Sequence, residues 1–235
     1  MKALFDGPIA KIYDSWVESG YYNYDQEAKA IAEIISPRKT IFELGIGTGN
    51  TAIRLAKMGF DVSGIDNAKD MLSILRKKLK KEKLNIRYEL SDMRNYNLRR
   101  KFDVVLSAGG AFIIAKLRNK FSFDTYFTNF EDLIKIFKTV SKMLKSNGLF
   151  LINVQYHGEK FELQIKDGTK YWFALEKKGK YHIKTHHFKK NGKVFLKKRY
   201  NFAYYPMSKI NKLAKDVGLS VIGFDKSKTF YVFGK

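Results

Sequence analysis

Three glycines at alternate positions follow an acidic residue at the end of an apolar run. The run covers residues 40–44 and contains Glu43, and the glycines are Gly45, Gly47 and Gly49. Such glycines allow positive φ angles and a close ligand approach, while the following helix start offers unpaired N–H groups. A carboxylate at Glu43 would repel a pyrophosphate but suits a ligand that carries an ammonium and a sulfonium. The stretch therefore predicts a strand, a nucleotide-binding turn and a helix.

The glycine spacing excludes two better-known phosphate sites. A dinucleotide fingerprint requires G-x-G-x-x-G, whereas here the third glycine comes one residue early and Asn50 occupies the position of the last glycine. A P-loop is excluded because no Gly-Lys-Ser/Thr follows.

A second acid, Asp66, ends the next predicted strand, residues 61–65, and a helix opens with Asn67 and contains Met71. A carboxylate at that strand end can accept hydrogen bonds from both hydroxyls of an adenosine ribose. Asp66 is therefore the strongest single candidate for a cofactor contact.

These two stretches resemble a known family. Residues 42–49 resemble the first motif of the class I (Rossmann-like) S-adenosylmethionine-dependent methyltransferases, and residues 64–66 with Met71 resemble the second. The resemblance implies S-adenosylmethionine as cofactor and S-adenosylhomocysteine as product. It implies that Asp92 contacts the adenine amino group and that Met93 lines the ring. The implied cofactor residues are Glu43, Gly45, Gly47, Gly49, Asp66, Asn67, Met71, Asp92, Met93 and Ser107.

The remaining core segments predict a doubly wound α/β fold. Residues 102–107 form a continuous apolar run typical of a parallel strand buried on both faces. We expect a loop over about 108–129, a helix over 130–144 and a fifth strand over 149–154. A last helix over 209–217 and a closing hairpin over 219–225 and 229–233 complete a seven-stranded, mostly parallel sheet with an antiparallel C-terminal hairpin. The resemblance covers residues 40–154.

Residues 155–205 predict an inserted antiparallel β-layer. Aromatic and charged residues alternate in four short runs that Gly-containing turns separate. The insertion resembles that of glycine- and amino-sugar-type N-methyltransferases, in which it covers the active site and lines the acceptor pocket. The aromatics Tyr171, Trp172, Phe173, Tyr204 and Tyr205 could form the wall of this pocket, although we expect most of them to form the core of the insertion.

Two residues are candidates for catalysis. His157, just past the fifth strand, is the best-placed base or acceptor ligand. Residues 1–36 predict a helical lid over the cofactor, in which Tyr13-Asp14 resembles a Tyr-Asp pair of many small-molecule methyltransferases. Packing of Tyr13 on the core is an equally good interpretation.

Composition limits the class of protein. The 235 residues fit one methyltransferase domain, and the absence of cysteine excludes a disulfide framework and a thiolate metal site. The four histidines lack partners at metal-ligand spacing, so we expect no metal. No signal peptide or membrane span is recognisable, which predicts a cytoplasmic protein without membrane contact. The net charge of +22 has two interpretations: an anionic partner such as nucleic acid, or an accumulation of Lys through genome composition or solubility.

The main functional hypothesis is transfer of a methyl group to an N or O atom of a small-molecule acceptor by in-line displacement. The Lys and Arg residues near 189–199 make an anionic acceptor one option. One alternative is an RNA or DNA methyltransferase, against which stand the missing Asn/Asp-Pro-Pro-Tyr/Phe motif and the missing cysteine. Another is a basic nucleic-acid-binding protein with a vestigial cofactor site. The acceptor and the oligomeric state stay open.

Overall fold

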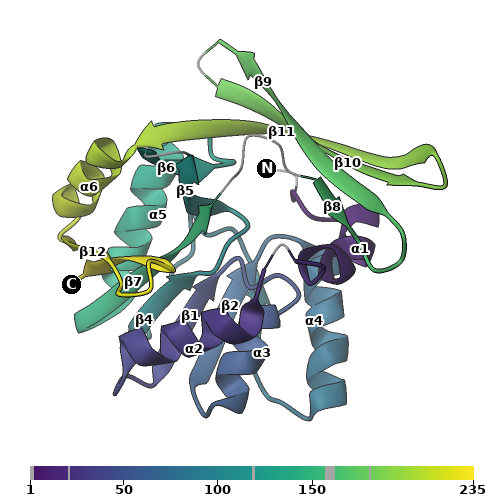
Figure 1. Cartoon of the computed structure of the whole chain (residues 1–235). Helices are drawn as coiled ribbons and strands as arrows, with labels where there is room; N and C mark the ends of the chain where they lie inside the picture. The colour runs from purple at the N-terminus through teal and green to yellow at the C-terminus, as the bar shows by residue number, and fades with distance from the viewer. Residues whose placement is uncertain (1–2, 21, 118–119, 157–161, 180) are drawn as a thin grey trace.

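The computed structural model describes residues 3–20, 22–117, 120–156, 162–179 and 181–235. Its central sheet has the order β3-β2-β1-β4-β7-β13-β12 (Figure 1). The first five strands are parallel, and β13 and β12 are antiparallel. The strands are β1 (Thr40–Leu44), β2 (Asp61–Asp66), β3 (Arg87–Leu90), β4 (Phe102–Ser107), β7 (Leu144–Tyr156), β12 (Ser220–Phe224) and β13 (Phe230–Gly234).

Helices cover both faces of this sheet. They are α2 (Tyr24–Ile35), α3 (Asn50–Lys57), α4 (Lys69–Glu82), α5 (Phe130–Met143) and α6 (Met207–Asp216), while a further helix, α1 (Pro8–Val17), packs against the insertion. Successive side chains of β4 alternate between two cores: Val105 packs in the core that includes α5 and α6, and Val104 packs in the core that includes α2, α3 and α4. This alternation is the reason that the strand is apolar throughout. The predicted doubly wound sheet is confirmed.

The segment after β4 differs from the prediction. The sequence predicts a loop over 108–129, but residues 112–125 contain the antiparallel strands β5 (Phe112–Leu117) and β6 (Lys120–Thr125). The end of β5 also pairs in parallel with the end of β7, for example Ile114 with Val154. Apolar side chains such as Phe112 and Phe123 stack on each other within the core, which stabilises the hairpin against this edge of the sheet.

The predicted β-insertion is present as β8 (Glu162–Gln164), β9 (Lys170–Lys178), β10 (Tyr181–Lys190) and β11 (Lys193–Pro206). Positive φ angles at Asn191 and Gly192 form the tight turn between β10 and β11. Strand β11 continues into an antiparallel pairing with β6, so that backbone hydrogen bonds join the insertion to the core. Figure 1 shows the long β9, β10 and β11 strands crossing above the central sheet.

The N-terminal segment lies between the insertion and the core (Figure 1). On α1, the ring of Trp16 packs against Tyr171 and Phe188 of the insertion, with ring centroids 4.6 and 5.3 Å apart. On α2, Ala28 and Ile31 pack on the core formed with α3 and α4. The predicted helical N-terminus is therefore present and contacts both the insertion and the sheet.

Candidate functional site

The glycine turn joins β1 to α3 at the carboxyl edge of the sheet. A Cβ on Gly47, where φ is 54°, would lie 3.4 Å from Met71 Cε and 3.9 Å from Asp66 Oδ2. The missing side chain therefore leaves room for a ligand beside Asp66. Gly49 has a different role, because a Cβ there would lie 2.3 Å from Leu75 Cδ1, and the residue does not line the cleft described next. It permits close packing of α3 on α4.

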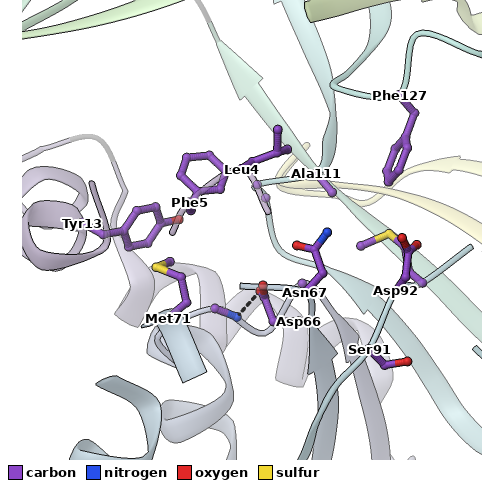
Figure 2. Close-up of a pocket in the computed structure, with 15 residues that line it drawn as sticks. Leu4, Phe5, Tyr13, Asp66, Asn67, Met71, Ser91, Asp92, Ala111 and Phe127 are labelled. Carbon is purple, nitrogen blue, oxygen red and sulfur yellow. Dashed lines mark hydrogen bonds between the residues drawn. The ribbon is translucent and has the colours of Figure 1, made fainter. Parts of the chain in front are cut away.

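A cleft of about 600 Å³, partly open to solvent, lies over the ends of β1, β2 and β3 (Figure 2). The N-terminal residues Leu4 and Phe5 and the loop residues Ala111 and Phe127 line its far side. The predicted site residues that line this cleft are Tyr13, Gly45, Gly47, Asp66, Asn67, Met71, Asp92 and Met93. The structure thus brings most of the predicted cofactor residues together.

Asp66 is held rigidly at the end of β2. Its Oδ2 accepts a hydrogen bond from the Gly47 N–H, and its Oδ1 accepts one from the Ala68 N–H, both at 2.8 Å. Burial raises the pKa of Asp66 to about 6 despite these backbone hydrogen bonds. Each oxygen retains a second lone pair, so the carboxylate can accept further hydrogen bonds from hydroxyls in the cleft.

Glu43 lies beneath the turn in a smaller hollow that shares Tyr13, Gly45 and Gly47 with the cleft. The side chain is 4% exposed, and its Oε2 has no hydrogen-bond partner among the described residues. Burial, followed by the charges of Glu27 and Asp66, raises the pKa of Glu43 well above its usual value. A cationic group in the hollow would satisfy this carboxylate, so the residues fit a ligand with an ammonium group.

Asp92 reaches the cleft but is already paired. Its oxygens accept hydrogen bonds from Arg94 Nε at 2.9 and 3.1 Å, and Arg94 also pairs with Asp132 at 3.3 Å. The Arg94 hydrogen bond holds the pKa of Asp92 below its usual value. The predicted contact of Asp92 with an adenine amino group therefore depends on lone pairs that this ion pair leaves free.

Another predicted residue, Ser107, lies away from the cleft. Ser107 is fully buried, and its hydroxyl donates a 3.3 Å hydrogen bond to the Phe112 carbonyl at the base of the β5–β6 hairpin. It does not line the cleft, because the hairpin that the sequence did not predict occupies this position. His157 lies outside the described residues.

A second pocket adjoins the cleft beneath the insertion and shares Phe5, Tyr13 and Gly110 with it. Its walls include Trp16 of α1 and Phe202 of β11. Polar groups also line it: Asp124, Gln155, Lys184 and His186. None of these four was a predicted site residue.

The buried His186 belongs to a hydrogen-bonded group at the top of this pocket. Its Nδ1 is 2.8 Å from the Tyr171 hydroxyl, and its Nε2 is 3.3 Å from the Tyr126 hydroxyl. Burial lowers the pKa of His186 well below its usual value. A neutral imidazole between two hydroxyls orients the aromatic wall of the pocket.

Burial and contacts show where two of the predicted wall aromatics and the basic residues of the insertion lie. Tyr171 packs in the core shared with α1, and Trp172 stacks on His187 with centroids 4.8 Å apart, so neither forms the pocket wall. The basic residues near 189–199 also lie outside the pocket. Lys190 pairs with Asp167 at 2.8 Å, and Arg199 pairs with Glu176 at 3.3 Å.

The strand order and the glycine turn define a class I (Rossmann-like) methyltransferase fold. Residues 41–148 match the sequence model of the methyltransferase domain family. This match covers just under half of the chain, and the solved structures that share the fold include S-adenosylmethionine-dependent methyltransferases.

Two curated relatives support this assignment. A putative methyltransferase, YqeM, of Bacillus subtilis is 32% identical over 62% of this chain and 53% of its own length. A dTDP-3-amino-3,4,6-trideoxy-alpha-D-glucopyranose N,N-dimethyltransferase of Streptomyces venezuelae is 29% identical over 44% of each chain. The chain thus spans about half the length of these relatives.

Solved structures show the same fold over the whole chain. Streptomyces venezuelae DesVI has a TM-score of 0.76 at 20% identity, covering 97% of this chain and 98% of its own. The S-adenosylmethionine-bound amino pentose methyltransferase CalS10 of Micromonospora echinaspora has a TM-score of 0.70 at 15% identity, covering 95% and 96%. The insertion is therefore part of the shared architecture.

The described residues contain neither a candidate membrane-spanning helix nor a candidate metal site. No helix in the described ranges is long and apolar enough to cross a membrane. Within the same ranges, no group of three or more His, Cys, Asp or Glu side chains could hold a metal ion.

Proposed function

We propose that this protein transfers a methyl group from S-adenosylmethionine to an amine nitrogen of a small molecule. The adjoining cleft and pocket carry the proposal. The cleft has the turn, the acids and the apolar residues that suit an adenosyl ligand, and the pocket beneath the insertion adjoins it at Phe5, Tyr13 and Gly110. The amino-sugar methyltransferases among the relatives support an amine as acceptor.

Binding in the cleft would use charge on one side and apolar contact on the other. Glu43 would pair with the ammonium of the cofactor, and Asp66 would accept hydrogen bonds from the ribose hydroxyls. Met71 and Phe127 would pack against apolar parts of the ligand (Figure 2). When bound, S-adenosylmethionine supplies a methyl group on a sulfonium, and transfer forms the bond to the acceptor nitrogen while the carbon–sulfur electron pair remains on sulfur.

The N-terminal segment would exclude water from the reaction. Phe5 and Tyr13 stand between the cleft and the pocket, and their rings are in edge contact at 5.6 Å. Positioning of the nucleophile against the methyl carbon can account for much of the rate enhancement in such a displacement. A base is needed only for an acceptor that arrives protonated.

Calorimetric titration with S-adenosylmethionine and S-adenosylhomocysteine, with NAD as control, tests the cofactor part of the proposal. We expect affinities on the order of micromolar for both adenosyl ligands and none for NAD. A tritiated methyl group then reports transfer to a panel of small amines. Absence of adenosyl binding, or binding of NAD instead, would overturn the proposed function.

A further inference from the structure

The adjoining pocket is lined by one buried lysine and one buried aspartate. Lys184, on β10, is 6% exposed, and Asp124, on β6, is 4% exposed. Both line the pocket, together with apolar residues such as Trp16, Phe112 and Phe202. Buried charges need partners, because removal of an ammonium or a carboxylate from water is costly.

The ammonium of Lys184 packs on two aromatic rings. It lies over the rings of Phe173 and Phe202, 4.5 and 5.0 Å from their centroids. Among the described residues, Asp124 is the charged group that acts on this ammonium, without forming a direct ion pair with it. Burial lowers the pKa of Lys184 to about 8, and the charge of Asp124 only partly opposes this effect. The two rings leave the N–H donors of the ammonium available to an anion.

Asp124 belongs to the β5–β6 hairpin of the core. Its strand pairs with β5, where Asp124 is opposite Ile113, three residues beyond the Gly110 that lines both cavities. The Ser122 hydroxyl donates a 2.5 Å hydrogen bond to Oδ1. Burial raises the pKa of Asp124 to about 7, although this hydrogen bond and the charge of Lys184 lower it. Lys184 instead belongs to the insertion that roofs the pocket.

We propose that Asp124 and Lys184 bind the two ends of one acceptor, a small molecule with an amine at one end and a carboxylate or phosphate at the other. This inference rests on the proposed function. The amine would lie at Asp124, next to the cofactor cleft, and the anionic group would pair with Lys184 under the roof. Such an acceptor supplies each buried charge with an opposite charge.

The same placement gives Asp124 a role in the reaction. An acceptor ammonium has no lone pair, so a proton must leave before nitrogen can attack. An N–H bond breaks, the O–H bond of the Asp124 carboxyl forms, and the freed lone pair remains on nitrogen for the new bond to carbon. Asp124 afterwards returns the proton to solvent.

Four probes that differ only at their ends test the assignment on the complex with S-adenosylhomocysteine. They are γ-aminobutyrate, 3-aminopropylphosphonate, n-butylamine and butyrate. Ligand-observed NMR and calorimetry measure binding, and tritium transfer from S-adenosylmethionine measures the reaction of the three amines. We expect one of the two doubly charged probes to bind at least about tenfold more tightly than either singly charged probe. The comparison between them distinguishes a carboxylate from a phosphate-like group.

Variants at Lys184 and Asp124 test the binding of the two ends of the acceptor separately. Lys184→Met should abolish butyrate binding and leave n-butylamine binding within about twofold, whereas Asp124→Asn should do the reverse and lower kcat by at least about tenfold. Lys189→Met, an exposed lysine on the same strand, is the matched control and should change neither. If Asp124 and Lys184 had only a structural role, each variant would weaken the binding of butyrate and of n-butylamine equally.

The outcomes for the inference and for the proposed function differ. Binding of both doubly charged probes no tighter than that of n-butylamine, or no transfer to any of the amines despite adenosyl binding, would overturn the acceptor assignment alone. Loss of S-adenosylhomocysteine binding in the unmodified protein would overturn the proposed function itself. If both variants bind S-adenosylhomocysteine as tightly as the unmodified protein does, their effects arise in the acceptor pocket.

Discussion

Asp14 of α1 accepts a 2.6 Å hydrogen bond from the hydroxyl of Thr48, in the glycine turn. Asn50 adds a 3.0 Å hydrogen bond to the same oxygen, and Lys78 of α4 forms a 2.7 Å ion pair with the other. The helix that carries Tyr13 is therefore attached to the turn on which the cofactor would lie. The position of the lid and the shape of the cleft depend on each other.

Asp14→Ala should weaken S-adenosylmethionine binding by about 1 kcal/mol, because α1 loses its charge-assisted contacts with the turn. Titration calorimetry measures the affinity, and hydrogen exchange should show faster exchange in α1. Ser15→Ala, an exposed neighbour on the same helix, is the control and should bind normally. Equal affinity in the Asp14 variant would mean that the attachment does not shape the cleft.

Asp66→Ala should weaken cofactor binding by about 1–3 kcal/mol through loss of the hydrogen bonds to the ribose. Asp61→Ala removes a matched carboxylate from the other end of β2, where the residue is exposed and pairs with Arg100. It should leave affinity unchanged. Normal binding by the Asp66 variant would remove this residue from the site.

Gly49→Ala should destabilise the fold more than Gly59→Ala. Both glycines have positive φ, 77° and 88°, so both variants strain the backbone by about 1 kcal/mol. A Cβ at Gly49 also meets fully buried Leu75 at 2.3 Å, whereas nothing lies within 4 Å at Gly59. Urea denaturation should show an additional loss of about 1–3 kcal/mol for Gly49→Ala. Equal losses would show that Leu75 moves aside freely.

Glu27→Gln should stabilise the protein increasingly as pH rises. Burial raises the pKa of Glu27 from 4.5 to about 8, although Thr51 donates a 2.7 Å hydrogen bond to it. Because the pKa of Glu27 is higher in the folded than in the unfolded state, folding favours its protonated form. The contribution of Glu27 to the stability of the fold is therefore complete below pH 4.5 and is lost as pH rises through about 8.

The measurement is the difference in unfolding free energy between Glu27→Gln and the unmodified protein. Because the amide of glutamine does not ionise, this difference should grow by on the order of a few kcal/mol between about pH 5 and pH 9. Glu33→Gln, at an exposed position of the same helix, should give no such trend. A constant difference across this range would show that Glu27 stays charged in the folded state.

The parts of the site that depend on local pattern could be predicted from the sequence. Gly47 and Asp66 lie where a strand meets a turn, and the strand order of the fold then brings their backbone and side chain within 2.8 Å. The glycine spacing assigns Gly49 to the cofactor because spacing alone does not reveal that Leu75 needs the space. Ser107 lies outside the cleft because the segment after it, expected as a loop, forms a hairpin.

The second pocket could not be predicted in the same way. Asp124 lies in a hairpin without a Gly or Pro turn signal, and its neighbour Phe123 pairs with Tyr205, which is distant in sequence. Only this long-range pairing brings the insertion over Asp124. The burial of Lys184 could have been predicted, because period-two alternation along the strand places it on the same face as His186 and the buried Phe188.

The pairing of β11 with β6 has a consequence for how molecules reach the site. Over residues 203–206, β11 is joined to β6 by backbone hydrogen bonds, which fix the roof of the pocket to the core. The roof therefore does not act as a hinged cover. The described segment before α2 is held over both cavities by side-chain contacts and a few hydrogen bonds, such as those of Asp14. We therefore expect substrates and products to pass on the side of α1, and the opening rate of that segment to limit turnover.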